Sequence, residues 1–175
     1  MTIRDEQPRD RPAILQLNRD AFGGDAEAEL IEKLHADGLI AASLVAEEDG
    51  RIIGHILLSW LHLDMGSRPL RGLALAPMAV DPARQLQGTG SRLVEAAIES
   101  ARQIGADAII VLGHPGFYPR FGFSAQDAAK LQSPFTGAAF MALELTPGAL
   151  AGNGGSVVYP PAFGLEPERA APTSH

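Results

Sequence analysis

The segment Val80-Asp-Pro-Ala-Arg-Gln-Leu-Gln-Gly88-Thr-Gly90-Ser91 is the point from which the organisation of this chain can be worked out. It follows the apolar run 73–80 and opens a segment, 90–104, whose apolar residues recur at helical spacing. The first backbone N–H groups of a helix have no partner within the helix, and glycine lets an anion approach them. The segment therefore predicts a phosphate-binding loop, although its glycines also fit an ordinary tight turn.

Two common phosphate-binding loops fit this segment less well. A P-loop needs Lys and then Ser or Thr after its last glycine, whereas Gly90 is followed by Ser91 and Arg92. A dinucleotide-binding fingerprint needs a third glycine where this chain has Leu93. An unrelated nucleotide-binding domain is also disfavoured, because antiparallel strands are expected before the loop.

The patterns around the loop predict an α/β (α+β) fold in a single domain, 1–164, with a flexible tail at 165–175. Strands are expected at 1–6, 39–46, 51–63, 68–80, 107–112, 138–145 and 156–159, and helices at 10–22, 25–36 and 90–104. Asp10 is expected to cap the first helix, and Asp49-Gly50 is a hairpin signal. Pro77 cannot donate a ladder hydrogen bond, so strand 68–80 is expected to part from its neighbour near this residue.

Composition excludes several classes of protein. The 175 residues are 46% hydrophobic, and the formal net charge of −7 argues against a protein that binds nucleic acid through its phosphates. The absence of cysteine excludes disulfides, thiolate metal sites and a cysteine nucleophile. No signal-peptide core and no apolar run of about 20 residues is present. A cytoplasmic protein that binds neither membrane nor metal is expected.

Two motifs together resemble the GNAT superfamily of acyl-CoA-dependent N-acetyltransferases. Gln85-Leu-Gln-Gly88-Thr-Gly90 matches the loop motif Gln/Arg-x-x-Gly-x-Gly/Ala, and Tyr118 stands four residues before the pair Gly122-Phe123. The run Tyr118-Pro-Arg-Phe-Gly-Phe123 is similar to a bacterial branch of this superfamily. The resemblance covers roughly residues 1–145. It implies a mixed, mostly antiparallel twisted sheet with a central strand-helix-strand unit, flanking helices, and strands that splay near the cofactor site.

The resemblance also implies the site residues. Tyr118 would protonate the departing CoA thiolate, a role that suits a phenol with a pKa of about 10; its alternative role is an aromatic anchor among phenylalanines. The backbone of strand 68–80 would pair with the pantetheine arm of acetyl-CoA, and the loop amides would hold the pyrophosphate. The cofactor-binding residues implied are Met78, Val80, Gln85, Leu86, Gln87, Gly88, Thr89, Gly90 and Ser91.

The general base is not identified by the sequence. Some members of the superfamily carry a glutamate where this chain has Ala74, so the base is left open among His55, His62, Asp64 and His114. The leading function is transfer of an acetyl group from acetyl-CoA to a primary amine of a small molecule or peptide, in a ternary complex. The alternative is a catalytically reduced acyl-CoA-binding sensor or interaction module. A homodimer is possible, and the acidic chain favours a cationic amine.

Overall fold

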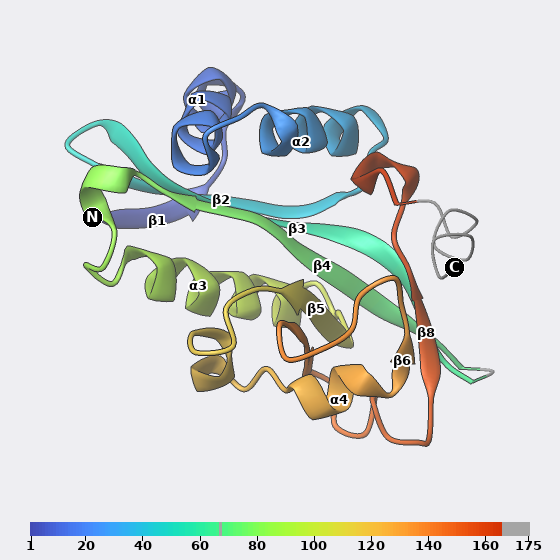
Figure 1. Ribbon diagram of the computed structural model, residues 1–175. Helices are drawn as coiled ribbons and strands as arrows, with labels where there is room; N and C mark the ends of the chain where they lie inside the picture. Colours follow the sequence, from blue (N-terminus) through green and yellow to red (C-terminus); the bar gives the residue numbers. More distant parts are fainter. Residues whose placement is uncertain (67, 166–175) are drawn as a thin grey trace. The chain divides into compact units, whose positions relative to one another are not determined.

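The computed structural model describes residues 1–66 and 68–165 (Figure 1). Except for Leu165, the predicted C-terminal tail lies outside the described residues. The helices are α1 (Arg11–Phe22), α2 (Ala26–Ala36), α3 (Thr89–Gln103) and α4 (Ala125–Ala129). The strands are β1 (Thr2–Asp5), β2 (Ile40–Glu48), β3 (Arg51–Met65), β4 (Arg68–Val80), β5 (Ala108–Leu112), β6 (Leu131–Gln132), β7 (Phe140–Glu144) and β8 (Gly155–Val158).

The strands form a mixed, mostly antiparallel sheet, as the sequence predicts. Its order is β1-β2-β3-β4-β5-β7, and β8 pairs with both β3 and β6. The pairs β1–β2, β2–β3, β3–β8 and β5–β7 are antiparallel, whereas β4–β5 and β6–β8 are parallel. Because β4 and β5 are parallel neighbours joined through α3, the predicted strand-helix-strand unit is confirmed.

The described chain divides into two compact units, to which β3 and β4 both contribute. Unit 1 comprises Met1–Ser59 and Leu75–Ile104. Within it, α1 and α2 cover one face of the strands and α3 covers the other (Figure 1). The buried stripe of α3 includes Leu93, which lies so close to β3 that a Cβ on Gly54 would meet its Cδ1 at 2.9 Å. The absence of a side chain at Gly54 therefore allows the close approach of α3.

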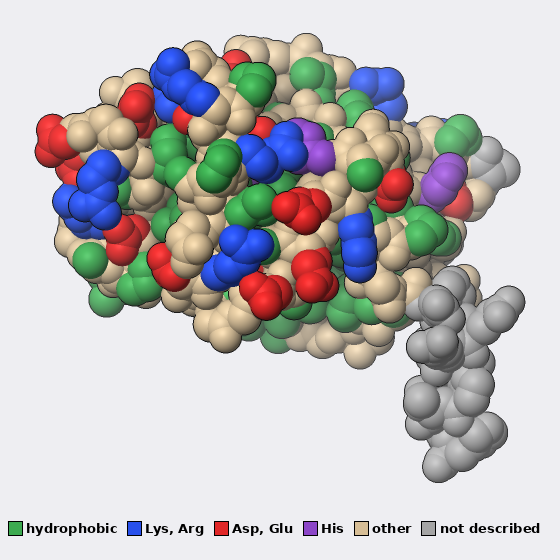
Figure 2. Space-filling view, turned by 90° about the horizontal axis from the view of Figure 1, so that it is seen from above, with side chains coloured by type: hydrophobic (Ala, Val, Ile, Leu, Met, Phe, Trp, Pro, Cys, Tyr) green, Lys and Arg blue, Asp and Glu red, His purple; other side chains and the backbone are tan. Residues whose placement is uncertain are grey.

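The surface of unit 1 mixes both signs of charge. Arg19 of α1 pairs with Asp25 at 3.0 Å, and Gln16 donates to Asp20 at 2.8 Å. The view onto α1 and α2 shows basic and acidic side chains interspersed (Figure 2). This face therefore lacks the continuous basic stripe that a nucleic-acid-binding surface normally presents.

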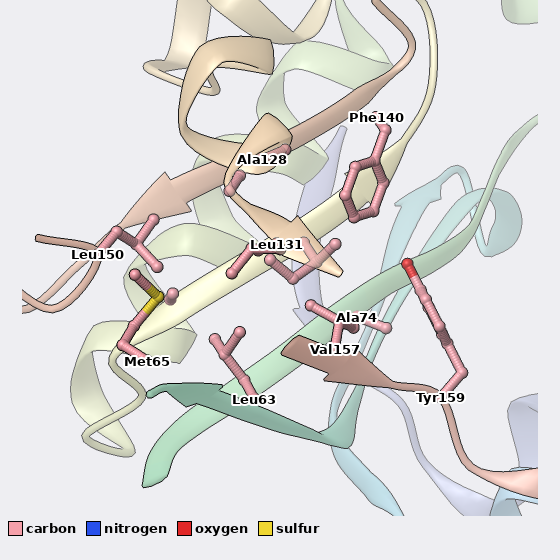
Figure 3. Close-up of a cluster of buried hydrophobic side chains, with 12 residues drawn as sticks. Leu63, Met65, Ala74, Ala128, Leu131, Phe140, Leu150, Val157 and Tyr159 are labelled. Atoms are coloured by element: carbon pink, nitrogen blue, oxygen red, sulfur yellow. The ribbon is translucent and has the colours of Figure 1, made fainter. Parts of the chain in front are cut away.

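Unit 2 comprises Trp60–Ala74 and the chain from Gly105 onward. Its core is an apolar cluster, which we call the unit 2 cluster (Figure 3). The strands contribute Leu63, Met65, Ala74, Ala108, Ile110, Leu131, Phe140, Ala142 and Val157, and the intervening segments contribute Ala128, Leu150 and Tyr159. Burial of this surface is the main favourable contribution to the folding of unit 2.

Several local sequence predictions can be compared with the structure. The hairpin turn is confirmed, since Asp49 and Gly50 have φ values of 51° and 75°, as a type I′ turn requires. Asp10 precedes α1, but its carboxylate makes no capping hydrogen bond to the helix. It instead accepts from Arg4 at 2.8 Å and from the amide of Gln7 at 2.7 Å. The short helix α4 is missing from the prediction because five residues are too few to show helical periodicity.

Candidate functional site

The approach to the glycine loop is fixed by contacts within unit 1. The Asp81 amide donates to the Ile53 carbonyl at 2.8 Å, and the Asp81 side chain accepts from the Ala83 amide at 2.9 Å. Arg84 then forms an ion pair with Glu48 of the β2–β3 hairpin. These contacts hold the end of β4 and the turn after it, so the segment that leads into the loop has a defined conformation.

The loop itself presents backbone amides that the protein does not use. Gly88 is the N-cap of α3 with φ 87°, and no side chain caps the helix. The Arg92 amide donates to the Gly88 carbonyl at 3.1 Å. Within the described chain, the amides from Leu86 to Ser91 have no hydrogen-bond acceptor. This arrangement suits an anion, because free N–H groups and the positive end of the helix dipole coincide.

The side chains of the loop differ in what they can contribute. Leu86 has a φ of 63° and is fully exposed, whereas Thr89 is buried, with its methyl group directed at Gly54. The Gln85 side chain donates to the Val80 carbonyl at 3.3 Å and so ties the loop to β4. The loop therefore offers mainly its backbone to a ligand. Gln87, Gly88 and Ser91 complete the predicted loop residues, and they lie between Leu86 and the first turn of α3.

Strand β4 loses its parallel neighbour before it reaches the loop. The register with β5 covers Gly72, Leu73 and Ala74, which face Ala108, Ile109 and Ile110, and in the described chain it continues no further. Met78 and Val80, the predicted pantetheine-binding residues, lie beyond this end and are half-buried. Pro77, which cannot donate a hydrogen bond, lies between the end of the register and Met78. An extended ligand could therefore pair with free backbone groups along this part of β4.

Tyr118 lies in unit 2, in the short 3-10 helix Tyr118–Phe121 that follows β5. Its ring makes edge-to-face contacts with Phe117 and Phe123, at centroid distances of 5.0 and 5.5 Å. The predicted anchoring role of the ring is thus present. These contacts fix the plane of the ring, which a group that transfers a proton at a defined atom requires.

Gly113 makes room for the Tyr118 ring, and sequence reasoning missed this role. A Cβ at position 113 would stand 2.3 Å from Cε2 of Tyr118 and 2.8 Å from Cδ2, so any side chain there would displace the ring. Gly116, three residues on, has nothing within 4 Å of the same virtual atom. A glycine directly after a buried strand and five residues before the tyrosine was the available signal.

The Tyr118 side chain combines a buried ring with a hydroxyl that has no partner among residues 1–66 and 68–165. The residue is 6% exposed, and burial raises the pKa of its phenol to about 12. Within the described residues the hydroxyl makes no hydrogen bond. Its oxygen is not fully buried, so a molecule outside the protein can reach it. The phenol therefore keeps its proton at neutral pH and can donate it to a group outside the protein.

His55, one of the base candidates, is enclosed in a hydrogen-bonded chain within unit 1. The Ser43 hydroxyl donates to Glu6 at 2.8 Å, so it accepts from Nε2–H of His55 at 3.1 Å. Asn18 donates to Nδ1 of His55 at 3.4 Å. His55 is fully buried, and burial is the main reason that its pKa is lowered to about 3. The imidazole is therefore neutral, with both nitrogens engaged.

The outer end of this chain is an ion-pair cluster at Glu6. The Glu6 carboxylate lies 3.3 Å from Nε2 of His35 and 3.5 Å from a guanidinium nitrogen of Arg11. Arg11 in turn approaches Nδ1 of His35 at 2.9 Å. A role in positioning α1 and α2 over the strands accounts for this cluster.

The remaining base candidates lie in unit 2. His62 and His114 are exposed, and the backbone carbonyl of His114 accepts from the amides of Phe117 and Tyr118 at 3.0 and 3.3 Å. Asp64 is half-buried and accepts from the Ser156 hydroxyl at 3.0 Å. The Ala74 side chain lies in the unit 2 cluster and is 2% exposed. None of these groups combines burial with an unused hydrogen-bonding atom, as Tyr118 does.

The described residues lack the side-chain groupings of a metal site and the long apolar helices of a membrane span. The described ranges 1–66 and 68–165 hold no group of three or more His, Asp or Glu side chains that could bind a metal ion. No helix in these ranges has the length and apolar character needed to cross a membrane.

Comparison with known proteins gives consistent matches along most of the chain. A sequence model of the Acetyltransferase (GNAT) family matches residues 11–123. The uncharacterized N-acetyltransferase YhbS of Escherichia coli K12 is 38% identical over 162 residues, which cover 91% of this chain and 96% of that protein. The crystal structure of Escherichia coli YhbS in complex with CoA has a TM-score of 0.84 at 36% identity, covering 94% of this chain and 92% of the other. A GNAT family acetyltransferase from Brucella melitensis in complex with acetyl-CoA has a TM-score of 0.76 at 34% identity, covering 93% and 97%.

Proposed function

This chain belongs to the Acetyltransferase (GNAT) family and is an acyltransferase, and on that premise we propose that it transfers an acetyl group from acetyl-CoA to a primary amine of a small molecule or peptide. The amine attacks directly in a ternary complex. The acetyltransferase domain comprises residues 1–164. The observation that carries the proposal is the set of unused amides at the start of α3.

The donor is held through the backbone of unit 1. The amides of Leu86 to Ser91 bind the CoA pyrophosphate, with Gln85 and Gln87 in the loop and Thr89 supplying its amide rather than its buried side chain. The free edge of β4 at Met78 and Val80 pairs with the amides of the pantetheine arm. The end of the β4–β5 register at Ala74 favours the pairing with pantetheine. The exposed left-handed conformation of Gly88 favours the binding of the pyrophosphate.

The transfer step requires one proton donor and one proton acceptor. The amine nitrogen attacks the thioester carbon, the carbon–sulfur bond breaks, and the thiolate takes the proton of the Tyr118 hydroxyl. A neutral phenol supports this role, because its pKa lies well above neutral pH. The amine's proton goes to water or to one of the remaining candidates, His62, Asp64 and His114, since Ala74 supplies no carboxylate and His55 has both nitrogens engaged.

The alternative function is an acyl-CoA-binding sensor without turnover. The apolar Ala74 is the observation in its favour, because a base on β4 is absent. A thiol-release assay with acetyl-CoA and a panel of amines, peptides and aminoglycosides separates the two functions. Acetyl transfer predicts CoA formation with at least one amine and a higher melting temperature with acetyl-CoA. A sensor would show the thermal shift without thiol release, and failure of both would contradict the donor site as well.

A further inference from the structure

Unit 1 contains a cavity of about 530 Å³ that the proposed function does not use. Its walls are the short 3-10 helix Pro8–Asp10 with one side of α1, the β2–β3 hairpin, and the turn at Asp81 and Pro82. In Figure 1 the hairpin extends beyond α1, and the cavity lies in the angle between them. None of the described residues that line it belongs to the loop 85–91, to which the proposed function assigns the CoA pyrophosphate. The volume is that of a site for a small organic molecule.

The most buried part of the cavity wall combines an ion-pair network with an apolar surface. Arg4 donates to the Asp10 carboxylate at 2.8 Å and to the Glu47 carboxylate at 3.0 Å. The buried side chain of Leu17 and the half-buried side chain of Ile52 line the same cavity. The cavity thus offers an apolar contact to the body of an organic molecule, next to charges that are already paired.

Each of the four carboxylates in the cavity wall already accepts a hydrogen bond from the protein. Two of them are the partners of Arg4. Asp20 accepts from the side chain of Gln16 at 2.8 Å. Asp81 accepts from the amide of Ala83 at 2.9 Å. The protein itself therefore supplies a donor to every acidic group of this cavity.

Two arginines of the cavity wall are not engaged in this way. Arg9 in the 3-10 helix and Arg51 in the hairpin are exposed, and neither makes a hydrogen bond or an ion pair with any residue of the described ranges. The charge of Arg9 nevertheless acts inside the cavity: after the hydrogen bonds from Arg4, it also helps to lower the pKa of the Asp10 carboxyl. Each guanidinium has a planar fork of N–H donors that matches a carboxylate. The unused groups of the cavity are therefore cationic donors.

We propose that this cavity is a further binding site, for a small organic molecule that carries a single carboxylate. Arg9 and Arg51 bind the carboxylate, and the uncharged body of the ligand lies against Leu17 and Ile52. Three arginines and four carboxylates line the cavity, which leaves one excess negative charge. A single carboxylate is therefore accepted more readily than a doubly charged phosphate or a polyanion. The site does not depend on the proposed acetyl transfer, because neither the loop 85–91 nor Tyr118 takes part in it.

The test is a titration, followed by backbone amide NMR, with four probes that share one aromatic ring: benzoate, benzamide, benzylammonium and phenyl phosphate. Benzoate should bind most tightly, and it should shift the amides of Ala13, Gly50 and Arg51 rather than those of residues 86–91. Arg9→Gln and Arg51→Gln should each weaken benzoate binding about tenfold, the loss expected for one charge-assisted hydrogen bond. Both variants should keep the melting temperature of the wild type, because neither guanidinium has a partner within the described chain.

Arg19→Gln is the matched control for these variants. Arg19 also lies on α1, but it pairs with Asp25 at 3.0 Å and does not line the cavity, so this variant should bind benzoate as the wild type does. Equal benzoate affinity in the wild type and in both cavity variants would overturn the proposal, as would the absence of benzoate shifts at these amides. Benzamide or benzylammonium binding there as tightly as benzoate would also overturn it. Tighter binding of phenyl phosphate would overturn the choice of a carboxylate. The titration contains no acetyl-CoA, so its outcome is independent of whether the acetyl-transfer assay succeeds.

Discussion

The buried histidine of unit 1 and the two buried tyrosines of unit 2 differ in how their polar atoms are satisfied. In unit 1, His55 lies in a chain of hydrogen bonds from Asn18 to Glu6, and Asp10 is held by Arg4. In unit 2, Tyr118 and Tyr159 bury aromatic rings while their hydroxyls make no hydrogen bond to any of the described residues. A buried polar group with its partners inside the protein stabilises the fold, whereas one without them is available to a ligand. The tyrosine hydroxyls, rather than the more deeply buried histidine, are therefore the groups available for chemistry.

The largest expected effect is on the reaction of unit 2. Tyr118→Phe should lower kcat by roughly 10²- to 10⁴-fold, because the thiolate then leaves without a proton donor. The melting temperature should stay close to that of the wild type, since the hydroxyl makes no hydrogen bond within the described chain. Steady-state thiol release measures the first quantity and calorimetry the second. A variant with unchanged kcat would mean that Tyr118 is only an aromatic anchor.

The paired polar groups of unit 1 should dominate stability in acid. The pKa of His55 is lowered to about 3 from its usual 6.5, so below pH 6.5 the unfolded chain binds a proton that the folded one does not. Stability should therefore be full above pH 6.5 and fall by up to ~1.4 kcal/mol per pH unit as the pH drops toward 3. Urea unfolding between pH 6.5 and 4.5 measures the slope.

His55→Gln is the control for that slope, because glutamine can still donate to Ser43 but does not titrate. The variant should show a flatter dependence on pH in the same range. The pH range of this experiment lies above the pH at which the Asp10 carboxyl titrates, because the hydrogen bonds from Arg4 lower its pKa to about 2. An identical slope in the variant would show that His55 is accessible to protons in the folded state.

In alkali, the buried phenols of unit 2 should make the stability fall as the pH rises. The pKa of Tyr118 is raised from 10 to about 12, so stability is full below pH 10 and is lost as the pH rises to 12. The loss from this one group amounts to at most ~1.4 kcal/mol per pH unit. Chemical unfolding between pH 9.5 and 11.5, about the usual tyrosine pKa, should be less steep in Tyr118→Phe than in the wild type. Equal slopes would mean that the phenol is solvated in the native protein.

Gly113→Ala sharpens the comparison without touching the hydroxyl. The new methyl would overlap the Tyr118 ring and should cost about 1–3 kcal/mol of stability, with a loss of roughly 10²-fold in kcat if the hydroxyl is displaced. Gly116→Ala is the matched control, because nothing lies within 4 Å of its virtual Cβ and its φ is not positive. Similar kcat values in the two variants would contradict a positioning role for Gly113.

The smallest expected effect is on the donor loop of unit 1. Gly88 and Gly105, at opposite ends of α3, have φ values of 87° and 76° with open space around them. Substitution by alanine should therefore cost each variant a similar ~1–2 kcal/mol of stability. Only Gly88→Ala should weaken CoA binding, by about tenfold in titration calorimetry, because only that methyl lies where the pyrophosphate approaches. Equal CoA affinities would indicate that the loop is an ordinary turn.

Much of the fold was predictable from local patterns. The limits of β4 agree with the predicted strand 68–80, and the Asp49-Gly50 turn and the amphipathic α3 give clear signals. The short elements α4 and β6 were not predictable, since they depend on packing in the unit 2 cluster rather than on periodicity. Of the candidate site, the loop and Tyr118 follow from motifs. Gly113 does not, because its role depends on how closely the Tyr118 ring folds back onto its backbone, which no sequence pattern specifies.

The central claim is that the loop amides bind the CoA pyrophosphate and that Tyr118 gives its proton to the departing thiolate. One crossed measurement tests it: CoA affinity and single-turnover thiol release, at saturating acetyl-CoA, in Gly88→Ala and Tyr118→Phe. The account predicts that Gly88→Ala loses affinity and keeps its rate, and that Tyr118→Phe loses rate and keeps its affinity. If both variants change the same quantity, or neither changes any, the assignment of the two roles is wrong.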